Sequence, residues 1–167
     1  MAEQSIIFYP DPRLRQKAEA VVDFDDSLRA FAGELRIAMV KAPGVGIAAP
    51  HVGVLKRLVV IQIEPASEPL YYVNPKVVWA SEETILHMEG NVSMPGVTEE
   101  IVRPARVRVE YQDLDGARHV EEADGFLAVC LQHEIDQLDG IFWIERLSKL
   151  KRDRVVKRYE KLRRAGA

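Results

Sequence analysis

The stretch EADGFLAVCLQHEIDQLDG, residues 122–140, decides the fold. Apolar residues fill nearly every position of FLAVCL, which predicts a buried helix rather than an amphipathic surface helix. We expect the helix to run from about Asp124 to Leu138 and to end near Gly140, because glycine commonly follows a helix C-terminus. The segment is therefore expected at the centre of the molecule.

The same stretch carries most of a metal-binding motif. His133 and Glu134 begin the pattern H-E-x-x-H, in which two histidines one helical turn apart hold a metal ion and the glutamate is the general base. The second histidine position holds Gln137, which shares a helix face with His133. Three interpretations follow: a hydrolase that has lost its site, a hydrolase with different ligands, or a helix that never held a metal.

The composition excludes several classes of protein. The 167 residues fit a single domain, residues 1–167, with 47% apolar and 29% charged residues as in an ordinary globule. Cys130 is the only cysteine, so no internal disulfide can form and nothing indicates secretion. The first residues lack a signal-peptide pattern, and no apolar run approaches the roughly 20 residues that span a bilayer. We expect a cytoplasmic protein that binds neither membrane nor DNA.

Charge is distributed unevenly along the chain. The net charge is −3, but residues 146–164 contain ten Lys or Arg against two acidic residues, which gives this segment +8 and the remainder −11. The segment predicts a basic C-terminal helix at about 148–164, with Ser148 as its N-cap. Its expected apolar stripe consists of Leu150, Val155, Tyr159 and Leu162. Such a helix is either a solvated amphipathic element or a surface that faces nucleic acid.

Local patterns predict the other elements. They are a helix at 26–41, a strand at 58–63, a strand at 70–74 and a hairpin at 106–122. The helix is capped by Asp25 or Asp26, and the second strand ends at Pro75 because proline cannot donate to a sheet. The hairpin turns at Asp115-Gly116. Short strands between a buried helix and a terminal helix indicate an α+β fold.

Three segments together resemble one enzyme family. GVGIAAPHVG (44–53), EGNVSMPG (89–96) and LQHEIDQLDG (131–140) resemble, in order and spacing, the G-x-G-x-A-A-x-Q loop, the E-G-C-x-S strand and the Q-H-E-x-D-H-x-x-G helix of peptide deformylases. YPDPRLR near the start and VNP at 73–75 agree as well, so the resemblance covers essentially the whole chain. It implies mixed, largely antiparallel sheets around the buried motif helix, with a C-terminal helix packed against them.

The resemblance also implies a reaction, the hydrolysis of the N-formyl group from nascent formyl-methionyl peptides. In that family one cysteine and two histidines hold a divalent ion (iron, zinc or nickel), which lowers the pKa of a bound water. The glutamate of the motif moves the proton. The loop glutamine and the backbone amide after the ligand cysteine stabilise the oxyanion.

When these roles are assigned to the matching positions of this sequence, several of the side chains differ from those of the family. The metal positions are His133, Asn91 in place of the cysteine, and Gln137 in place of the second histidine. The catalytic positions are Glu134, His51 in place of the oxyanion glutamine, and the backbone amide of Val92. The substrate-binding positions are Gly44, Val45, Gly46, Ile47, Gly90 and Ser93. Thr98 lies near a position where the family commonly has arginine.

The substitutions predict a weakened metal site. Neutral, weakly basic amides at Asn91 and Gln137 replace a thiolate and an imidazole, the ligand types that favour iron, zinc or nickel. We therefore expect the metal to be absent or weakly bound. Without it Glu134 has to activate water alone, and general-base catalysis typically contributes only about 10²–10⁴-fold. Metal-dependent deformylase activity is accordingly expected to be lost or strongly reduced.

Two alternatives to a simply inactive site remain. In an active metallohydrolase with a rearranged site, His51 and His133 share an ion with Glu134. In a non-catalytic protein, His51 instead bonds to Glu134 or Gln137 and fills the site. Such a protein binds N-terminal (formyl-)methionyl peptides, or binds the ribosome through the basic helix, which resembles the element that bacterial deformylases dock near the exit tunnel. Cys130 is expected in the core.

Overall fold

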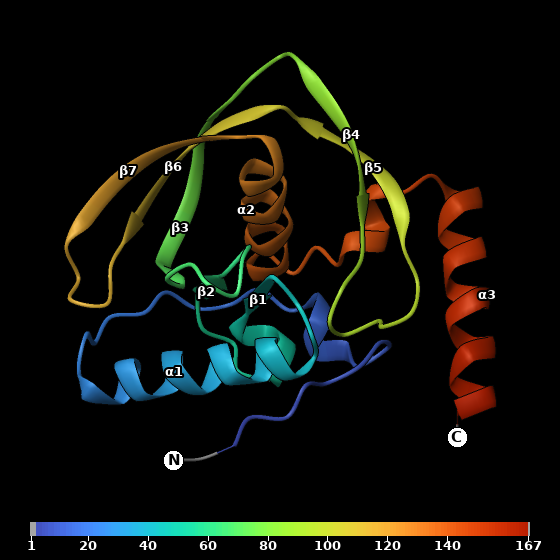
Figure 1. Cartoon of the computed structure of the whole chain (residues 1–167), viewed down its shortest axis with the longest axis horizontal. Helices are drawn as coiled ribbons and strands as arrows, with labels where there is room; N and C mark the ends of the chain where they lie inside the picture. The colour runs from blue at the N-terminus through green and yellow to red at the C-terminus, as the bar shows by residue number, and fades with distance from the viewer. Residues whose placement is uncertain (1–2, 167) are drawn as a thin grey trace.

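The computed structural model describes residues 3–166 and has an α+β architecture (Figure 1). The helices are α1 (Asp26–Lys41), α2 (Gly125–Leu138) and α3 (Lys149–Gly166), and the 3-10 helices are η1 (Pro12–Arg15), η2 (Ala49–Val52) and η3 (Trp143–Arg146). The strands are β1 (Gly46–Ala48), β2 (Leu58–Ile61), β3 (Leu70–Ala80), β4 (Thr84–Glu89), β5 (Glu99–Pro104), β6 (Arg106–Gln112) and β7 (Arg118–Asp124). One sheet has the order β1-β2-β3-β6-β7, β4 and β5 form a separate ribbon, and every pairing of strands is antiparallel.

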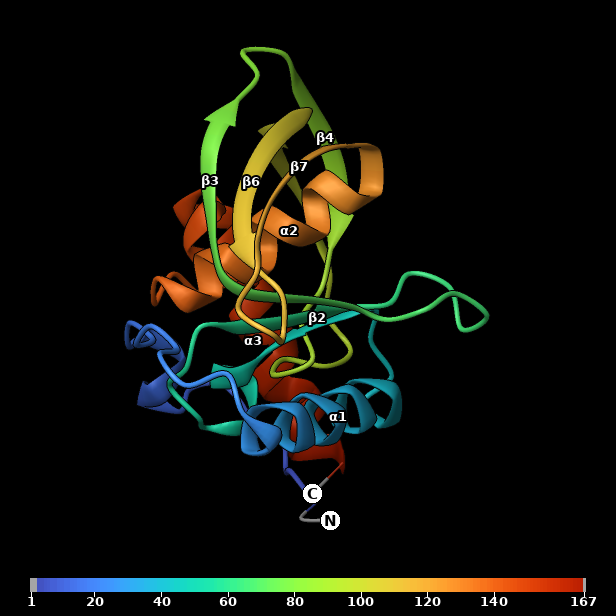
Figure 2. The same cartoon turned by 90° about the vertical axis from the view of Figure 1, so that its left-hand side faces the viewer.

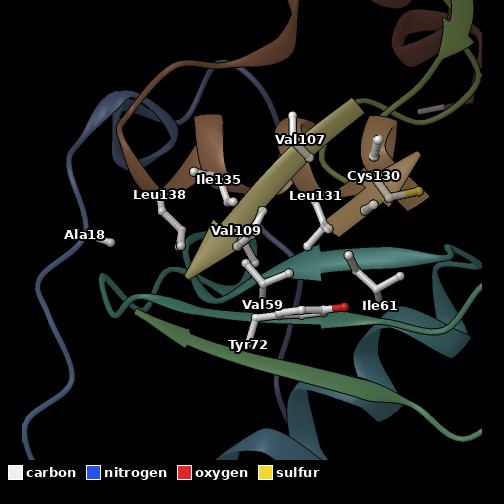
Figure 3. Packing of buried hydrophobic residues seen from close by; sticks show 13 residues of the cluster. Ala18, Val59, Ile61, Tyr72, Val107, Val109, Cys130, Leu131, Ile135 and Leu138 are labelled. Atoms are coloured by element: carbon white, nitrogen blue, oxygen red, sulfur yellow. The ribbon is translucent and has the colours of Figure 1, made fainter. Parts of the chain in front are cut away.

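Helix α2 lies in the middle of these elements, as predicted. In Figure 1 the strands β3, β6 and β7 pass on one side of it, and the β4–β5 ribbon passes on the other. The helix carries ten buried residues, from Ala128 to Leu138, which confirms the expected all-round burial. Figure 3 shows Leu131 and Ile135 of α2 packed against Val59 and Val109 of the sheet.

Strand β2 separates two hydrophobic clusters, because successive side chains of a strand point to opposite faces. Val59 and Ile61 face the α2 cluster, whereas Leu58 and Val60 belong to the cluster around α1. Figure 2 shows α1 and α2 on opposite sides of β2. The sheet is therefore buried on both faces here, which holds the β1 strand and the loop before it firmly beside α2.

Several sequence predictions are confirmed. Helix α1 has the expected bounds, and the carboxylate of Asp25 accepts a hydrogen bond from Leu28 N at 3.0 Å. The β6–β7 hairpin turns at Asp115-Gly116, where Gly116 has a φ of +86°. Ser148 Oγ accepts a hydrogen bond from Lys151 N at the start of α3. Cys130 is buried in the α2 cluster.

Other predictions of strands were wrong. Strand β2 ends at Ile61 rather than at residue 63, and β3 does not stop at Pro75 but continues to Ala80. The pairing of β3 with β6 shifts register between Val73 and Lys76, so the missing N–H of the proline falls within an irregularity of the ladder. The segment 89–96 is not a strand, because only Glu89 belongs to β4 and the rest forms a loop.

The apolar stripe predicted for α3 is only half correct. Val155 and Tyr159 are buried in a third cluster, whereas Leu150 and Leu162 are 62% and 46% exposed. Tyr159 meets the ring of Tyr9 edge-on at 6.1 Å between centroids. Helix α3 thus packs through one short stripe, and several of its basic residues, among them Arg154, Lys157 and Arg158, are exposed. Within residues 3–166, no helix is long and apolar enough to cross a membrane.

Candidate active site

A cavity of about 450 Å³ opens beside α2, between the loop before β1 and the loop that joins β4 to β5. Its lining includes many of the positions singled out from the sequence: Gly44, Val45, Gly46, His51, Gly90, Asn91, Val92, His133 and Glu134. Three other such positions, Ile47, Ser93 and Gln137, lie behind this surface and are at most 1% exposed. Ile47 points into the α1 cluster, because the strand β1 alternates its side chains between the two faces.

His133 is held on both ring nitrogens. Its Nδ1 lies 2.8 Å from Oε1 of Glu89, and its Nε2 lies 3.0 Å from Nδ2 of Asn91. The orientation of the Asn91 amide follows from its other bond, since Oδ1 accepts a hydrogen bond from Ser93 N at 2.8 Å. The NH₂ group therefore donates to His133 Nε2, and the ring carries its proton on Nδ1, which donates to Glu89.

This arrangement bears directly on the protonation of His133. Burial lowers the pKa of His133, but the carboxylates of Glu134 and Glu89 outweigh burial and raise the pKa overall. A second proton on Nε2 would point at the NH₂ group of Asn91, so the Asn91 bond opposes protonation and favours the neutral ring. The Nε2 lone pair, through which the ring could bind a metal, is thereby used by Asn91.

Glu89 is anchored from a second side by a buried ionic chain. Arg103 donates to both carboxylate oxygens of Glu89, at 2.6 and 2.9 Å, and to Asp136 at 2.9 Å. Arg146 also donates to Asp136. Burial alone would raise the pKa of Glu89, but the hydrogen bonds from His133 and Arg103 outweigh it and lower the pKa to about 2. Glu89 is therefore ionised at neutral pH and fixes the ring of His133.

The side chain of His51 forms a hydrogen bond with the backbone. Its Nδ1 accepts a hydrogen bond from Ala48 N at 3.0 Å, which closes the N-terminus of η2. Burial, with His133 nearby, lowers the pKa of His51 to about 3, so the ring is neutral and its proton is on Nε2. His51 Nδ1 lies 3.8 Å from Glu134 Oε1, too far for a hydrogen bond. Neither nitrogen of His51 offers a free lone pair.

Gln137 and Asn91 make separate hydrogen bonds. Gln137 Nε2 donates to the carbonyl of Leu14 at 2.7 Å, which ties α2 to η1. Gln137 Oε1 is buried without a donor within residues 3–166. The amides at the two positions that the sequence analysis assigned to metal ligands thus form hydrogen bonds within the protein, one to His133 and one to the backbone.

Glu134 is the remaining carboxylate of the motif. Its Oε1 is buried without a hydrogen-bond donor in the described chain, and burial raises its pKa to about 7. A Cβ atom at Gly46 would lie 2.8 Å from Oε2 of Glu134. Glycine is therefore needed at 46 for this carboxylate to reach its place beside the cavity.

The donor set does not fit a transition metal. Within residues 3–166 no cluster of three or more His, Cys, Asp or Glu side chains is arranged to hold an ion. A site shared by His51 and His133 would require lone pairs that the Ala48 amide and Asn91 already occupy. Cys130 lines the cavity, but burial raises the pKa of its thiol to about 12, so it offers no thiolate near neutral pH.

The wall of the cavity contains residues that the sequence analysis did not assign to the site. They are Met88, Phe126 and Val129, and Thr98, which the sequence analysis did note, lines the cavity as well. Phe126, Val129 and Cys130 precede His133 by seven, four and three residues, so they share its face of α2. Helical spacing counted backward from His133 would have identified them. The cavity is thus polar where it meets His133 and Glu134, and largely apolar elsewhere.

Known proteins resemble this chain over nearly its whole length. Residues 3–153 match the family model described as polypeptide deformylase. A protein named "Peptide deformylase-like" from Brucella melitensis biotype 1 is 58% identical over 164 residues, 98% of this chain and 100% of its own. Another of that name from Rhizobium meliloti is 56% identical over 167 residues, 100% of this chain and 97% of its own.

Relatives named as deformylases are also found. A "Peptide deformylase" of the same Rhizobium meliloti strain is 44% identical over 164 residues, 96% of this chain and 94% of its own. The crystal structure of a peptide deformylase from Legionella pneumophila superposes with a TM-score of 0.93 at 37% identity, covering 99% of this chain and 98% of that one. The similarity thus extends over the whole described fold.

Proposed function

Because this chain belongs to the polypeptide deformylase family, we propose that it keeps the peptide pocket of a deformylase and has lost the metal-dependent hydrolysis of formyl groups. The observation that carries the proposal is the hydrogen bond from Asn91 to Nε2 of His133, at 3.0 Å. It places an amide donor against the lone pair that a metal would need. The retained function is the binding of N-terminal methionyl peptide segments without turnover.

The side chains around His133 support the loss of the metal. In the family the ion is a divalent metal, which activates water and polarises the formyl oxygen. Here His133 has no thiolate beside it, His51 accepts from the Ala48 backbone, and Gln137 donates to Leu14. Glu134 remains as the one group able to take a proton from water, and a lone general base supplies only part of such a rate enhancement.

The shape of the cavity supports peptide binding. Its volume of about 450 Å³ suits a small ligand, and its wall of Val45, Met88, Phe126 and Val129 suits an unbranched apolar side chain such as methionine. The close approach of Gly44 to Val92 brings the loops on either side of the cavity together.

The relatives support a role apart from deformylation. Rhizobium meliloti strain 1021 has both a protein named "Peptide deformylase-like" and one named "Peptide deformylase". The first is 56% and the second 44% identical to this chain, so this chain resembles the deformylase-like protein more. The two names in one organism are consistent with a division of roles between the two relatives.

The decisive experiment measures formate release from formyl-Met-Ala-Ser. The protein is purified anaerobically without chelators, assayed with added iron, nickel or zinc, and analysed for bound metal. We expect no stoichiometric metal and no release above the Glu134→Ala variant, while calorimetry detects binding of the peptide. Formate release that is lost together with bound metal in His51→Ala would overturn the proposal in favour of a rearranged metal site.

A second proposal concerns the exposed basic face of α3. Arg154, Lys157, Arg158 and Lys161 are all exposed, while Val155 and Tyr159 hold the helix to the body. The helix thus presents cations that no packing contact requires, which supports docking onto the ribosome and a cytoplasmic location. Binding through phosphates would weaken steeply with salt.

Co-sedimentation with ribosomes tests this docking. We expect the four exchanges Arg154→Glu, Lys157→Glu, Arg158→Glu and Lys161→Glu to abolish binding together. Charge reversal at Arg106 and Arg118, on the β6–β7 hairpin, is the matched control and should leave binding unchanged. Absent binding, or binding insensitive to salt, would reject the proposal.

A further inference from the structure

One buried acceptor at the cavity has no hydrogen-bond partner in the described part of the chain. Glu134 Oε1 receives no hydrogen bond from residues 3–166, although Glu134 as a whole is only 4% exposed. Buried polar groups without a partner are costly and rare in native proteins. Gln137 Oε1 is also buried without a hydrogen-bond donor, but Gln137 does not line the cavity. Glu134 is therefore the acceptor that a ligand can reach.

The basic side chains near Glu134 form hydrogen bonds with other groups or are uncharged. The buried guanidinium of Arg103 donates to Glu89 and Asp136. His133 is bonded to Glu89 and Asn91, and the buried ring of His51 is neutral. In the family a divalent ion supplies positive charge at this point. In this chain the carboxylate has been kept while the ligands of its counter-charge have been replaced.

The cavity has room for a cation of a different kind. The apolar residues Val45, Met88, Phe126 and Val129 line the same space that Glu134 reaches. An N-terminal methionine carries its ammonium group on the same carbon as its side chain. One residue can therefore place the side chain against the apolar wall and the ammonium group against Glu134. An ammonium donates charge-assisted hydrogen bonds, which are about twice as strong as neutral ones.

We propose that the pocket selects free, unformylated methionyl N-termini, with the α-ammonium group in contact with Glu134. This inference rests on the proposed loss of metal-dependent hydrolysis. A formyl group removes the positive charge and brings a carbonyl oxygen towards a carboxylate, which is unfavourable. The preferred ligand is then the product of deformylation rather than its substrate, and the protein distinguishes N-termini that have been processed from those that have not.

Calorimetry with three peptides tests the inference: Met-Ala-Ser, formyl-Met-Ala-Ser and acetyl-Met-Ala-Ser. We expect the free amine to bind at least about tenfold more tightly than either neutral peptide, as one charge-assisted contact provides. Glu134→Gln, which keeps the shape of the side chain, should reduce this preference to within about twofold by weakening the binding of the free amine. Glu110→Gln, an exposed carboxylate on β6, is the control for a lost negative charge and should keep the preference.

The outcomes separate this inference from the proposed function. Equal or tighter binding of the neutral peptides, without formate release, overturns the inference and leaves the proposed function standing. No binding of any peptide overturns both. Formate release overturns the proposed function, and the acetyl peptide, which is not a formamide, then still decides whether the free amine is preferred. A thermal melt of Glu134→Gln confirms that the variant is folded.

Discussion

Asn91 shows how one side chain changes the chemistry of a site while the scaffold persists. Its amide accepts from Ser93 N and donates to His133 Nε2, so it satisfies two groups at once. A cysteine at this position would supply a thiolate in place of both bonds. If the metal site is lost as proposed, these two hydrogen bonds take its place and tie the loop at Asn91 to α2.

Restoring the family's ligands should restore metal binding. The variant Asn91→Cys/Gln137→His offers a thiolate and two imidazoles, a donor set suited to zinc, nickel or iron. We expect about one metal ion per chain by elemental analysis, and formate release raised at least about 10²-fold over the unsubstituted chain. The single variant Asn91→Cys should bind metal weakly, since only His133 accompanies the thiolate. A double variant without metal would contradict this account.

Replacement by alanine is predicted to change the free energy of unfolding in opposite directions at two glycines. A Cβ at Gly44 would lie 2.7 Å from Cγ1 of Val92, a stiff β-branched side chain, whereas a Cβ at Gly33 in α1 meets nothing within 4 Å. Gly44→Ala should lower the free energy of unfolding by about 1–3 kcal/mol, and Gly33→Ala should raise it by up to about 1 kcal/mol. Urea titrations measure both. A neutral Gly44→Ala would show that the two loops can separate.

The identity of the altered site residues could be read from the sequence, but their bonding could not. Spacing and resemblance drew attention to Asn91, Gln137 and His51. The acceptor of Gln137 is the carbonyl of Leu14, which is 123 positions away along the chain and carries no local signal. The bond from Ala48 N to His51 depends on the geometry of a short 3-10 helix. Burial of Ile47 likewise follows from the register of β1 with β2.

At the scale of elements, α3 is attached by few side chains. Val155 is fully buried and Leu150 is 62% exposed, although both were predicted in one stripe. Val155→Ala should lower the free energy of unfolding by about 2 kcal/mol through lost burial and the cavity left behind. Leu150→Ala is the matched control and should change it by less than about 0.5 kcal/mol. Equal effects would mean that α3 packs differently.

The elements that were predicted correctly are those whose sequence signals are local. Helix α1 has a capping aspartate and helical spacing, and the β6–β7 hairpin has an Asp-Gly turn. Helix α2 follows from its continuous apolar run. The β4–β5 ribbon was not predicted, because one face of it stays exposed at Leu86 and Val102 and its partner strand is supplied only by the fold. The extension of β3 past Pro75 similarly depends on β6.

At the scale of the whole molecule, an ionic chain that is buried up to Arg146 joins the β4–β5 ribbon to α2 and η3. Glu89 belongs to β4, Arg103 to β5, Asp136 to α2 and Arg146 to η3. Removing one charge from such a chain leaves the others buried without compensation. The chain therefore links the β4–β5 ribbon to the central helix.

This linkage predicts sensitivity to acid. The pKa of Glu89 is lowered to about 2 from its ordinary value of 4.5, so its contribution is complete above pH 4.5 and is lost as the pH falls through the folded-state value. The difference corresponds to roughly 3 kcal/mol of unfolding free energy. Urea titrations between pH 6 and pH 2 should show this loss. The Glu89→Gln variant should have a lower free energy of unfolding at pH 6, and that free energy should change less with pH. An equally steep profile in the variant would assign the effect to other carboxylates.

The hydrogen bonds of Asn91 also bear on how such a lineage can evolve. Reversion of Asn91 to cysteine alone leaves Ser93 N without its acceptor and His133 Nε2 without its donor, while only one histidine is present to share an ion. Reversion of Gln137 alone removes the donor to Leu14 and creates no ligand set. We therefore expect each single exchange to be deleterious and only the pair to restore a set of ligands, a pattern called reciprocal sign epistasis. Descendants that carry both amides are expected to retain them.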